Sequence, residues 1–175
     1  MKSFKILSIF IAMIISSQSA LSNEGSLNNI TNDQLDLAIK ELKDNPNDAT
    51  QKTVFALLNQ STFLIATTGQ SIRGKKDKNG VVESEAGSKA SFIMTSDGSG
   101  NSYIPVFTSW SDLEAHNKRS APIWEKSGQN AIAMSANDVW LYATDSKNNV
   151  FGVVINPSTM PLPLNKKIIN ALATK

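Results

Sequence analysis

The chain has 175 residues, with 17 lysines and arginines against 15 aspartates and glutamates, one histidine and no cysteine. This length suits one domain, which can bury about 70% of the surface of its unfolded chain. Without cysteine the domain has no disulfides, so its core must hold it together. Zinc normally takes cysteine and histidine ligands, so we expect neither a metal nor a cofactor.

The first 22 residues have the pattern of a secretory signal peptide. Lys2 and Lys5 precede the apolar run Ile6–Ile15, and Ala20-Leu21-Ser22 offers the small side chains that a signal peptidase reads. The apolar run is about half of the roughly 20 residues that span a membrane. We therefore expect cleavage after Ser22, a flexible lead over residues 23–30, and a periplasmic or secreted protein without a membrane anchor.

Removal of the signal peptide changes the charge balance. Both of its charged residues are lysines, so 15 basic residues remain against 15 acidic ones. A neutral protein exerts no overall attraction on nucleic acid or on an anionic membrane. We therefore expect a protein partner and no nucleic acid.

A helical hairpin is predicted at the start of the domain. Thr31 and Gln34 have the spacing of a capping box, and apolar residues follow at helical intervals. Pro46 ends this first helix, because proline disfavours helical geometry in the residue before it. Asp48 is the predicted N-cap of the second helix.

Strands and short helices alternate along the rest of the chain. Asp97–Asn101 has the glycines of a tight hairpin, and Ser109 and Ser135 each begin a capping pattern for a further helix. The last helix is expected after Pro163. The predicted strands are Thr62–Thr67, Ser91–Thr95, Tyr103–Phe107, Ala131–Met134 and Val150–Ile155, with a less regular extended segment at Pro122–Trp124. The prediction is an α+β fold over residues 31–175: a single compact domain with a mixed β-sheet, the N-terminal helical hairpin and further short helices packed on it.

Five short strings, in this order, resemble the N-terminal domain family of the SseB (enhanced serine sensitivity) protein. They are Leu35-x-x-Ala38-Ile39, Phe55-x-x-Leu58, Phe63-Leu64, Ile104-Pro105-Val106-Phe107-Thr108-Ser109 and Gly152-Val153-Val154-Ile155-Asn156-Pro157. The resemblance extends from about Leu35 to Leu172. It implies the fold and carries over no catalytic residue.

The sequence offers few candidates for catalytic side chains. The single histidine, His116, is predicted to be a surface or helix-end residue and not a catalytic base. A hydrolase with a pair of carboxylates stays open, since such pairs form only in the folded chain. The acidic residues considered for it are Glu83, Glu85, Asp112 and Glu114. We expect a protein that is not an enzyme.

Tryptophans and one basic segment are the candidates for partner binding. Trp110 and Trp124 lie in polar surroundings, whereas Trp140 is expected in the core. Arg73, Lys75 and Lys76 belong to the glycine-rich segment Gln70–Lys89, which also carries glutamates. Its mixed charge favours a solvated loop over a phosphate or lipid-headgroup site.

These features favour an exported, non-enzymatic protein-binding domain. Its specific form would be an immunity protein that neutralises a periplasmic toxin. An accessory factor of a secretion or envelope complex is the alternative, and a carboxylate hydrolase is the third hypothesis.

Overall fold

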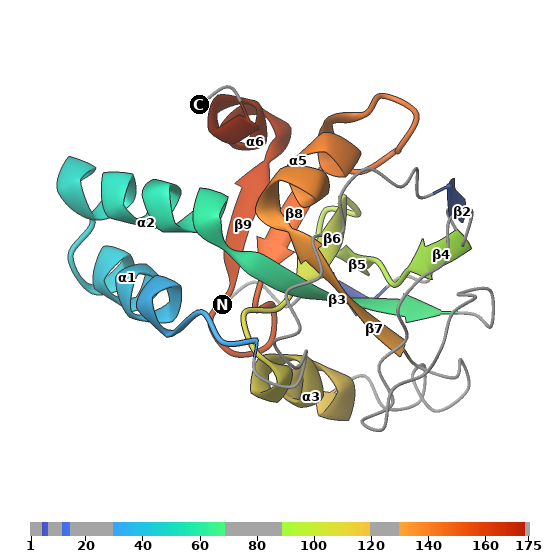
Figure 1. The fold of residues 1–175 in the computed structure, drawn as a ribbon, viewed down its shortest axis with the longest axis horizontal. Helices are drawn as coiled ribbons and strands as arrows, with labels where there is room; N and C mark the ends of the chain where they lie inside the picture. Colours follow the sequence, from blue (N-terminus) through green and yellow to red (C-terminus); the bar gives the residue numbers. More distant parts are fainter. Residues whose placement is uncertain (1–4, 7–11, 15–29, 69–88, 120–129, 174–175) are drawn as a thin grey trace.

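Two β-sheets, with helices on both sides, make up the protein (Figure 1). The computed structural model describes residues 5–6, 12–14, 30–68, 89–119 and 130–173. In chain order the elements are β1 (Lys5–Ile6), β2 (Ala12–Ile14), α1 (Asp33–Asp44), α2 (Asp48–Gln60), β3 (Thr62–Thr68), β4 (Lys89–Phe92), β5 (Thr95–Ser96), β6 (Ser102–Val106), α3 (Trp110–Arg119), β7 (Asn130–Ser135), α5 (Ala136–Thr144), β8 (Gly152–Ile155), β9 (Leu162–Asn165) and α6 (Lys166–Ala173).

The sheets differ in strand direction. The five-stranded sheet has the order β1-β5-β6-β8-β9 and is mixed, because β6 and β8 are parallel while the other neighbours are antiparallel. The four-stranded sheet, β2-β4-β3-β7, is antiparallel throughout. Leu64 and Phe107 join the two sheets by exchanging two backbone hydrogen bonds of 2.9 Å. The α+β single-domain prediction with its helical hairpin is confirmed, and the strands are shared between a mixed sheet and a second, antiparallel one.

Strand β3 is buried on both faces. Because successive side chains of a strand point to opposite sides, Phe63 and Ile65 enter the main core while Leu64 and Ala66 enter a smaller second core. The main core includes Trp140, whose ring centroid lies 5.9 Å from that of Phe63. Figure 1 shows α5 and α6 above the strands and α3 below them, and α3 contributes to the second core.

The predicted N-caps of the two helices in the N-terminal hairpin are each wrong by one residue. Asn32, and not Thr31, is the N-cap of α1, and its side chain makes no cap bond. Its amide instead donates to the carbonyl oxygens of Thr62 (3.0 Å) and Thr108 (2.8 Å), which fixes the start of the helix to β3 and to the segment after β6. Asn47, and not Asp48, caps α2, and it forms a capping box with Thr50.

Three other elements differ from the prediction. The segment Ser91–Thr95 divides into the end of β4 and the start of β5, which belong to different sheets. Helix α3 is longer than expected and includes His116. Residues before the last helix form β9, where Pro163 is tolerated because β9 is an edge strand of its sheet.

The first residues pair at the sheet edges. β1 is antiparallel to β5, and β2 is antiparallel to β4. Both lie within the expected signal peptide. The Gln70–Lys89 segment, apart from Lys89 in β4, and Pro122–Trp124 lie outside the described residues. Within the described part of the chain, no helix is both long and apolar enough to cross a membrane.

Gly152 is required where β8 meets β9. A Cβ at this position would collide with the backbone carbonyl oxygen of Leu164 and would lie 3.0 Å from the Cα of Asn165. Gly98, in the β5–β6 hairpin, has nothing within 4 Å of an added Cβ. We expect Gly152→Ala to lower the free energy of unfolding by about 1–3 kcal/mol, because backbone atoms would have to move. Gly98→Ala should stay within about 0.5 kcal/mol. Urea unfolding measures both, and equal stabilities would contradict this packing.

Candidate functional site

The ends of β6 and β8 meet at one edge of the mixed sheet. The two strands are parallel, with Val106 opposite Ile155, so the residues that follow each strand lie side by side. They include Thr108 and Asn156, each the second-last residue of one of the two longest strings of the sequence analysis. In open α/β sheets the carboxyl ends of parallel strands are a common place for ligands. We therefore considered this edge first as a site.

Thr108 and Asn156 form a buried pair. The Asn156 Oδ1 accepts from the Thr108 backbone N–H (3.0 Å), and its Nδ2 donates to the Thr108 Oγ1 (2.7 Å). The exposed fractions are 0% for Thr108 and 1% for Asn156. Asn156 has a positive φ of 45°, which asparagine tolerates better than most residues. The turn after β8 therefore places this amide against β6.

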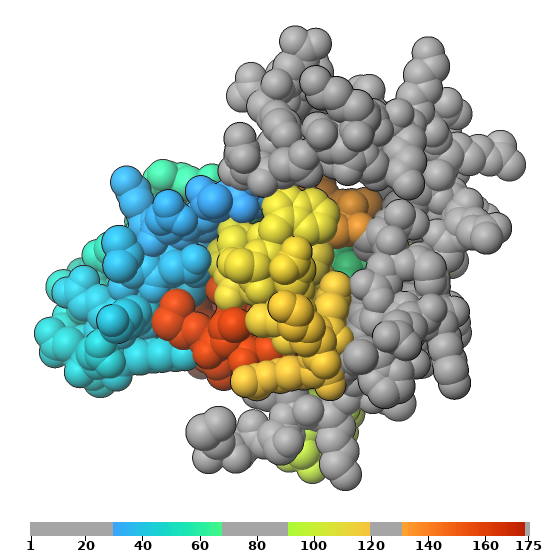
Figure 2. Space-filling model, turned by 90° about the horizontal axis from the view of Figure 1, so that it is seen from below, coloured from blue at the N-terminus to red at the C-terminus, as the bar shows by residue number. Residues whose placement is uncertain are grey.

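Two carboxylates complete what we call the polar junction: Asp36, Thr108, Ser109, Asp112, Asn156 and Thr159. The Thr108 Oγ1 lies 2.8 Å from Oδ1 of Asp36, on α1, and 3.0 Å from Oδ2 of Asp112, on α3. Ser109 and Thr159 donate to Asp112 at 2.6 and 2.5 Å. In Figure 2 the turn after β8, in orange-red, lies between α1 in blue and α3 in yellow. The polar junction thus joins α1, α3 and the segments after β6 and β8 at one face.

The electrostatics of the polar junction act mainly on Asp36. Burial raises the pKa of its carboxyl, and the negative charge of Asp112 raises the pKa further. The hydrogen bonds from Thr108 and Asn156 lower the pKa and offset part of this effect. The sequence analysis considered Asp112 as one member of a possible catalytic carboxylate pair. It did not consider Asp36, which the structure places beside the same hydroxyl.

His116 is buried in the last turn of α3, so of the two predicted positions, surface or helix end, the structure has the helix end. The residue is 3% exposed, and its ring lies 5.2 Å, centroid to centroid, from that of Phe107. The Nδ1 lies 2.7 Å from the Ser158 Oγ. Burial, aided by the charge of Arg119, lowers its pKa to about 4, so the ring is a weak base that a substrate does not reach.

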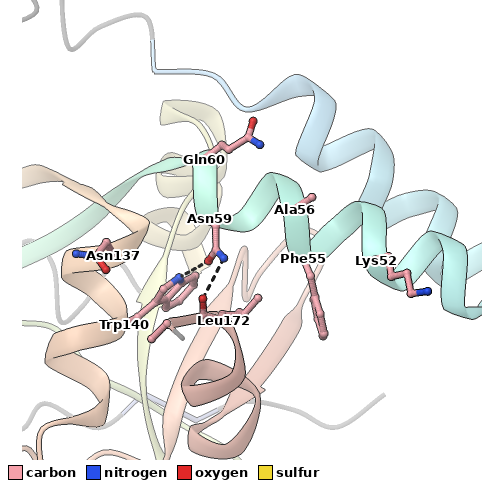
Figure 3. A pocket seen from close by; sticks show the side chains of 9 residues that line it. Lys52, Phe55, Ala56, Asn59, Gln60, Asn137, Trp140 and Leu172 are labelled. Atoms are coloured by element: carbon pink, nitrogen blue, oxygen red, sulfur yellow. Dashed lines mark hydrogen bonds between the residues drawn. The ribbon is translucent and has the colours of Figure 1, made fainter. Parts of the chain in front are cut away.

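A groove opens between α2, α5 and α6 (Figure 3). Its volume is about 540 Å³. At one end Asn59 joins the three helices: its Oδ1 accepts from the Trp140 Nε1, and its Nδ2 donates to the Leu172 carbonyl oxygen, both at 3.0 Å. Phe55 adds apolar surface, and among the described residues of the lining Lys52 is the charged one.

One exposed leucine lies on α5, a helix that contributes to the lining of this groove. Leu141 is 58% exposed and lies one helical turn after Asn137, which lines the groove. Leucine at such exposure on a folded domain marks a candidate contact surface when it adjoins other apolar groups. The sequence analysis missed the groove, because its residues come from three helices whose relative placement no local pattern specifies.

The predicted partner-binding residues have different outcomes. Trp110 is partly buried and packs against the second core. Trp140 lies in the main core, as expected. Arg73, Lys75, Lys76 and Trp124 lie outside the described residues. In the described part of the chain, no three acidic, histidine or cysteine side chains gather as a metal site.

The Thr108 hydroxyl can be tested by two substitutions. Thr108→Val removes the hydroxyl that both carboxylates and Asn156 contact, and we expect a loss of about 2–3 kcal/mol of unfolding free energy. Thr108→Ser keeps the hydroxyl and removes one methyl group, so its cost should be about 1 kcal/mol. Urea unfolding at pH 7 compares them. A valine variant as stable as the serine variant would show that these hydrogen bonds contribute nothing.

The comparisons with known proteins agree with the sequence pattern. The profile of the SseB protein N-terminal domain matches residues 35–171. This span includes the polar junction and all of the residues lining the groove except Leu172 and Ala173. No curated protein and no solved structure matches the chain. The chain belongs to the SseB protein N-terminal domain family.

Proposed function

We propose that this protein is a non-enzymatic protein-binding domain that acts after export, in the periplasm or outside the cell. The observation that carries this proposal is how the fold uses its reactive groups. His116 is buried against Phe107, and the carboxylates of Asp36 and Asp112 accept hydrogen bonds from the protein's own side chains. Meanwhile the groove beside Leu141 leaves apolar surface open to a partner.

The groove is the proposed contact surface. Helices α2, α5 and α6 are held together at its end by the two hydrogen bonds of Asn59, so the surface is formed before a partner arrives. A preformed surface lowers the entropy cost of binding. Lys52 favours a partner that brings a carboxylate beside an apolar side chain.

The specific form that we propose is an immunity protein, which binds a toxin delivered to the periplasm. An accessory factor of a secretion or envelope complex would use the same kind of surface. A toxin encoded beside this gene would favour the first form. A secretion defect on gene deletion would favour the second.

Export is supported by the sequence of the first 22 residues. Cleavage after Ser22 would remove β1 and β2, each of which is the terminal strand of its sheet. All pairings among the remaining strands would therefore stay intact. The mature protein keeps both cores and the polar junction.

Processing is the first expected result. When the full chain is expressed in a bacterium with two membranes, mass spectrometry should find a mature protein in the periplasm that begins at Asn23. Ile9→Asp with Ile11→Asp should block cleavage, because charges interrupt the apolar run. Ile9→Leu with Ile11→Leu is the matched control and should be processed. Full-length wild-type protein in the cytoplasm would overturn the export proposal.

Binding is the second expected result. We expect the mature protein to form a complex with the toxin encoded beside its gene, measured by calorimetry. Lys52→Glu and Leu141→Asp should each weaken the affinity at least tenfold, about 1.4 kcal/mol. Leu37→Asp is the control, because Leu37 is 68% exposed on α1 and does not line the groove.

The outcomes separate the parts of this proposal. Absence of a complex would overturn the immunity role. A complex weakened by Leu37→Asp and not by the groove variants would keep the binding role and overturn the groove. Hydrolysis of peptidoglycan by the mature protein, lost in Asp112→Asn, would favour the carboxylate hydrolase, for which the proximity of Asp36 and Asp112 to one hydroxyl is the supporting observation.

A further inference from the structure

The Thr108 hydroxyl has more hydrogen-bond acceptors around it than its single proton can serve. A threonine hydroxyl carries one proton and two lone pairs. Three carboxylate oxygens surround the Thr108 Oγ1: Oδ1 and Oδ2 of Asp36, at 2.8 and 3.1 Å, and Oδ2 of Asp112, at 3.0 Å. Asn156 donates to one lone pair of this oxygen. If both carboxyls are ionised, one of them must face the other lone pair without a proton between them.

We infer that Asp36 and Asp112 form an acid pair that takes up one proton on Asp36, and that this proton strengthens the attachment of α1 to the ends of β6 and β8. The protonated Asp36 donates to the free lone pair of the Thr108 Oγ1. The Thr108 proton then goes to Oδ2 of Asp112. Every donor and lone pair of the Thr108 hydroxyl is used in this arrangement.

The hydrogen bonds indicate why Asp36 is the member that takes the proton. Ionised Asp112 receives Ser109 on one oxygen and Thr159 on the other, at 2.6 and 2.5 Å. Asp36 shares the Thr108 proton, and its other donor, the Asn156 Nδ2, is 3.3 Å away. The negative charge of a carboxylate is therefore better stabilised on Asp112 than on Asp36.

The surrounding charges agree with this assignment. Asp112 on α3 and Asp33 on α1 are the charged groups that act on Asp36, and both raise its pKa, after the larger effect of burial. From the turn after β8, Asn156 and Thr159 face the pair and are neutral. His116, the nearby base on α3, bonds Ser158 and is neutral above its pKa of about 4.

The consequence is a dependence of stability on pH. Because the pKa of Asp36 is higher in the folded than in the unfolded chain, the folded chain binds more protons between these two pKa values. The contribution of Asp36 to the free energy of unfolding is therefore greatest below the unfolded pKa. It decreases as the pH rises through the folded pKa. This inference rests on the geometry of the polar junction and not on the proposed function.

Carboxyl titration by ¹³C NMR tests the acid pair. Asp112→Asn should lower the pKa of Asp36, because the like charge disappears and the new amide can donate to the Thr108 Oγ1. Asp33→Asn removes the same charge from α1 without touching that hydroxyl, so its effect on the pKa should be smaller. Unchanged titration of Asp36 in Asp112→Asn, or equal shifts in the two variants, would overturn the inference.

A second measurement does not depend on the folding of Asp112→Asn. The amide of Asp36→Asn can donate to the Thr108 Oγ1 as the protonated acid does, but it does not titrate. We expect this variant to be at least as stable as the wild type at pH 7. As the pH falls through the acid range, the free energy of unfolding of the wild type should rise relative to that of Asp36→Asn. Asp36→Ala, which has no donor, should be less stable than both at pH 7. Parallel profiles of stability against pH for the wild type and Asp36→Asn would contradict the proposed acid pair.

Discussion

The hydroxyl of Thr108 is the contact on which the arrangement of the domain depends. It receives a hydrogen bond from Asn156, after β8, and lies against carboxylates from α1 and α3. A buried polar group costs about 1–3 kcal/mol when its partner is lost. Helices α1 and α3 and the segments after β6 and β8 must therefore all bring a side chain to this hydroxyl. Helix α1 meets this condition because Asp36 follows Leu35 in sequence: the carboxylate enters the polar junction while the leucine packs in the main core.

The strand that leads to Thr108 also connects the two cores. Ile104 and Val106 of β6 lie in the main core, whereas Phe107 enters the second core and pairs with Leu64 of β3. His116 packs on Phe107. The only histidine in the chain therefore belongs to the structural support of the polar junction. Its low pKa is a result of that burial, so a shifted pKa is here no sign of catalysis.

The polar junction and the groove use different kinds of side chain. Among the described residues, Asp36 and Asp112 accept hydrogen bonds from neighbouring side chains at the strand ends, and His116 is buried. The described lining of the groove between α2, α5 and α6 combines apolar side chains, amides and Lys52. Asn59 holds its helices at a fixed distance. The two regions are built from different elements, apart from the core that they share.

The sequence by itself determined the local elements. The Ser109 and Ser135 caps, the Asp97–Asn101 hairpin and the strands before Thr108 and Asn156 were predictable, because each depends on residues a few positions apart. It also identified the family. Tertiary structure decided the rest. The Asn32 side chain makes no cap bond and instead contacts β3 and the segment after β6. Strand β9 forms because β8 offers it an edge, and Asp36 meets Asp112 only at a shared hydroxyl. The groove likewise exists only between packed helices. Such contacts join distant residues, and no local pattern of side chains contains them.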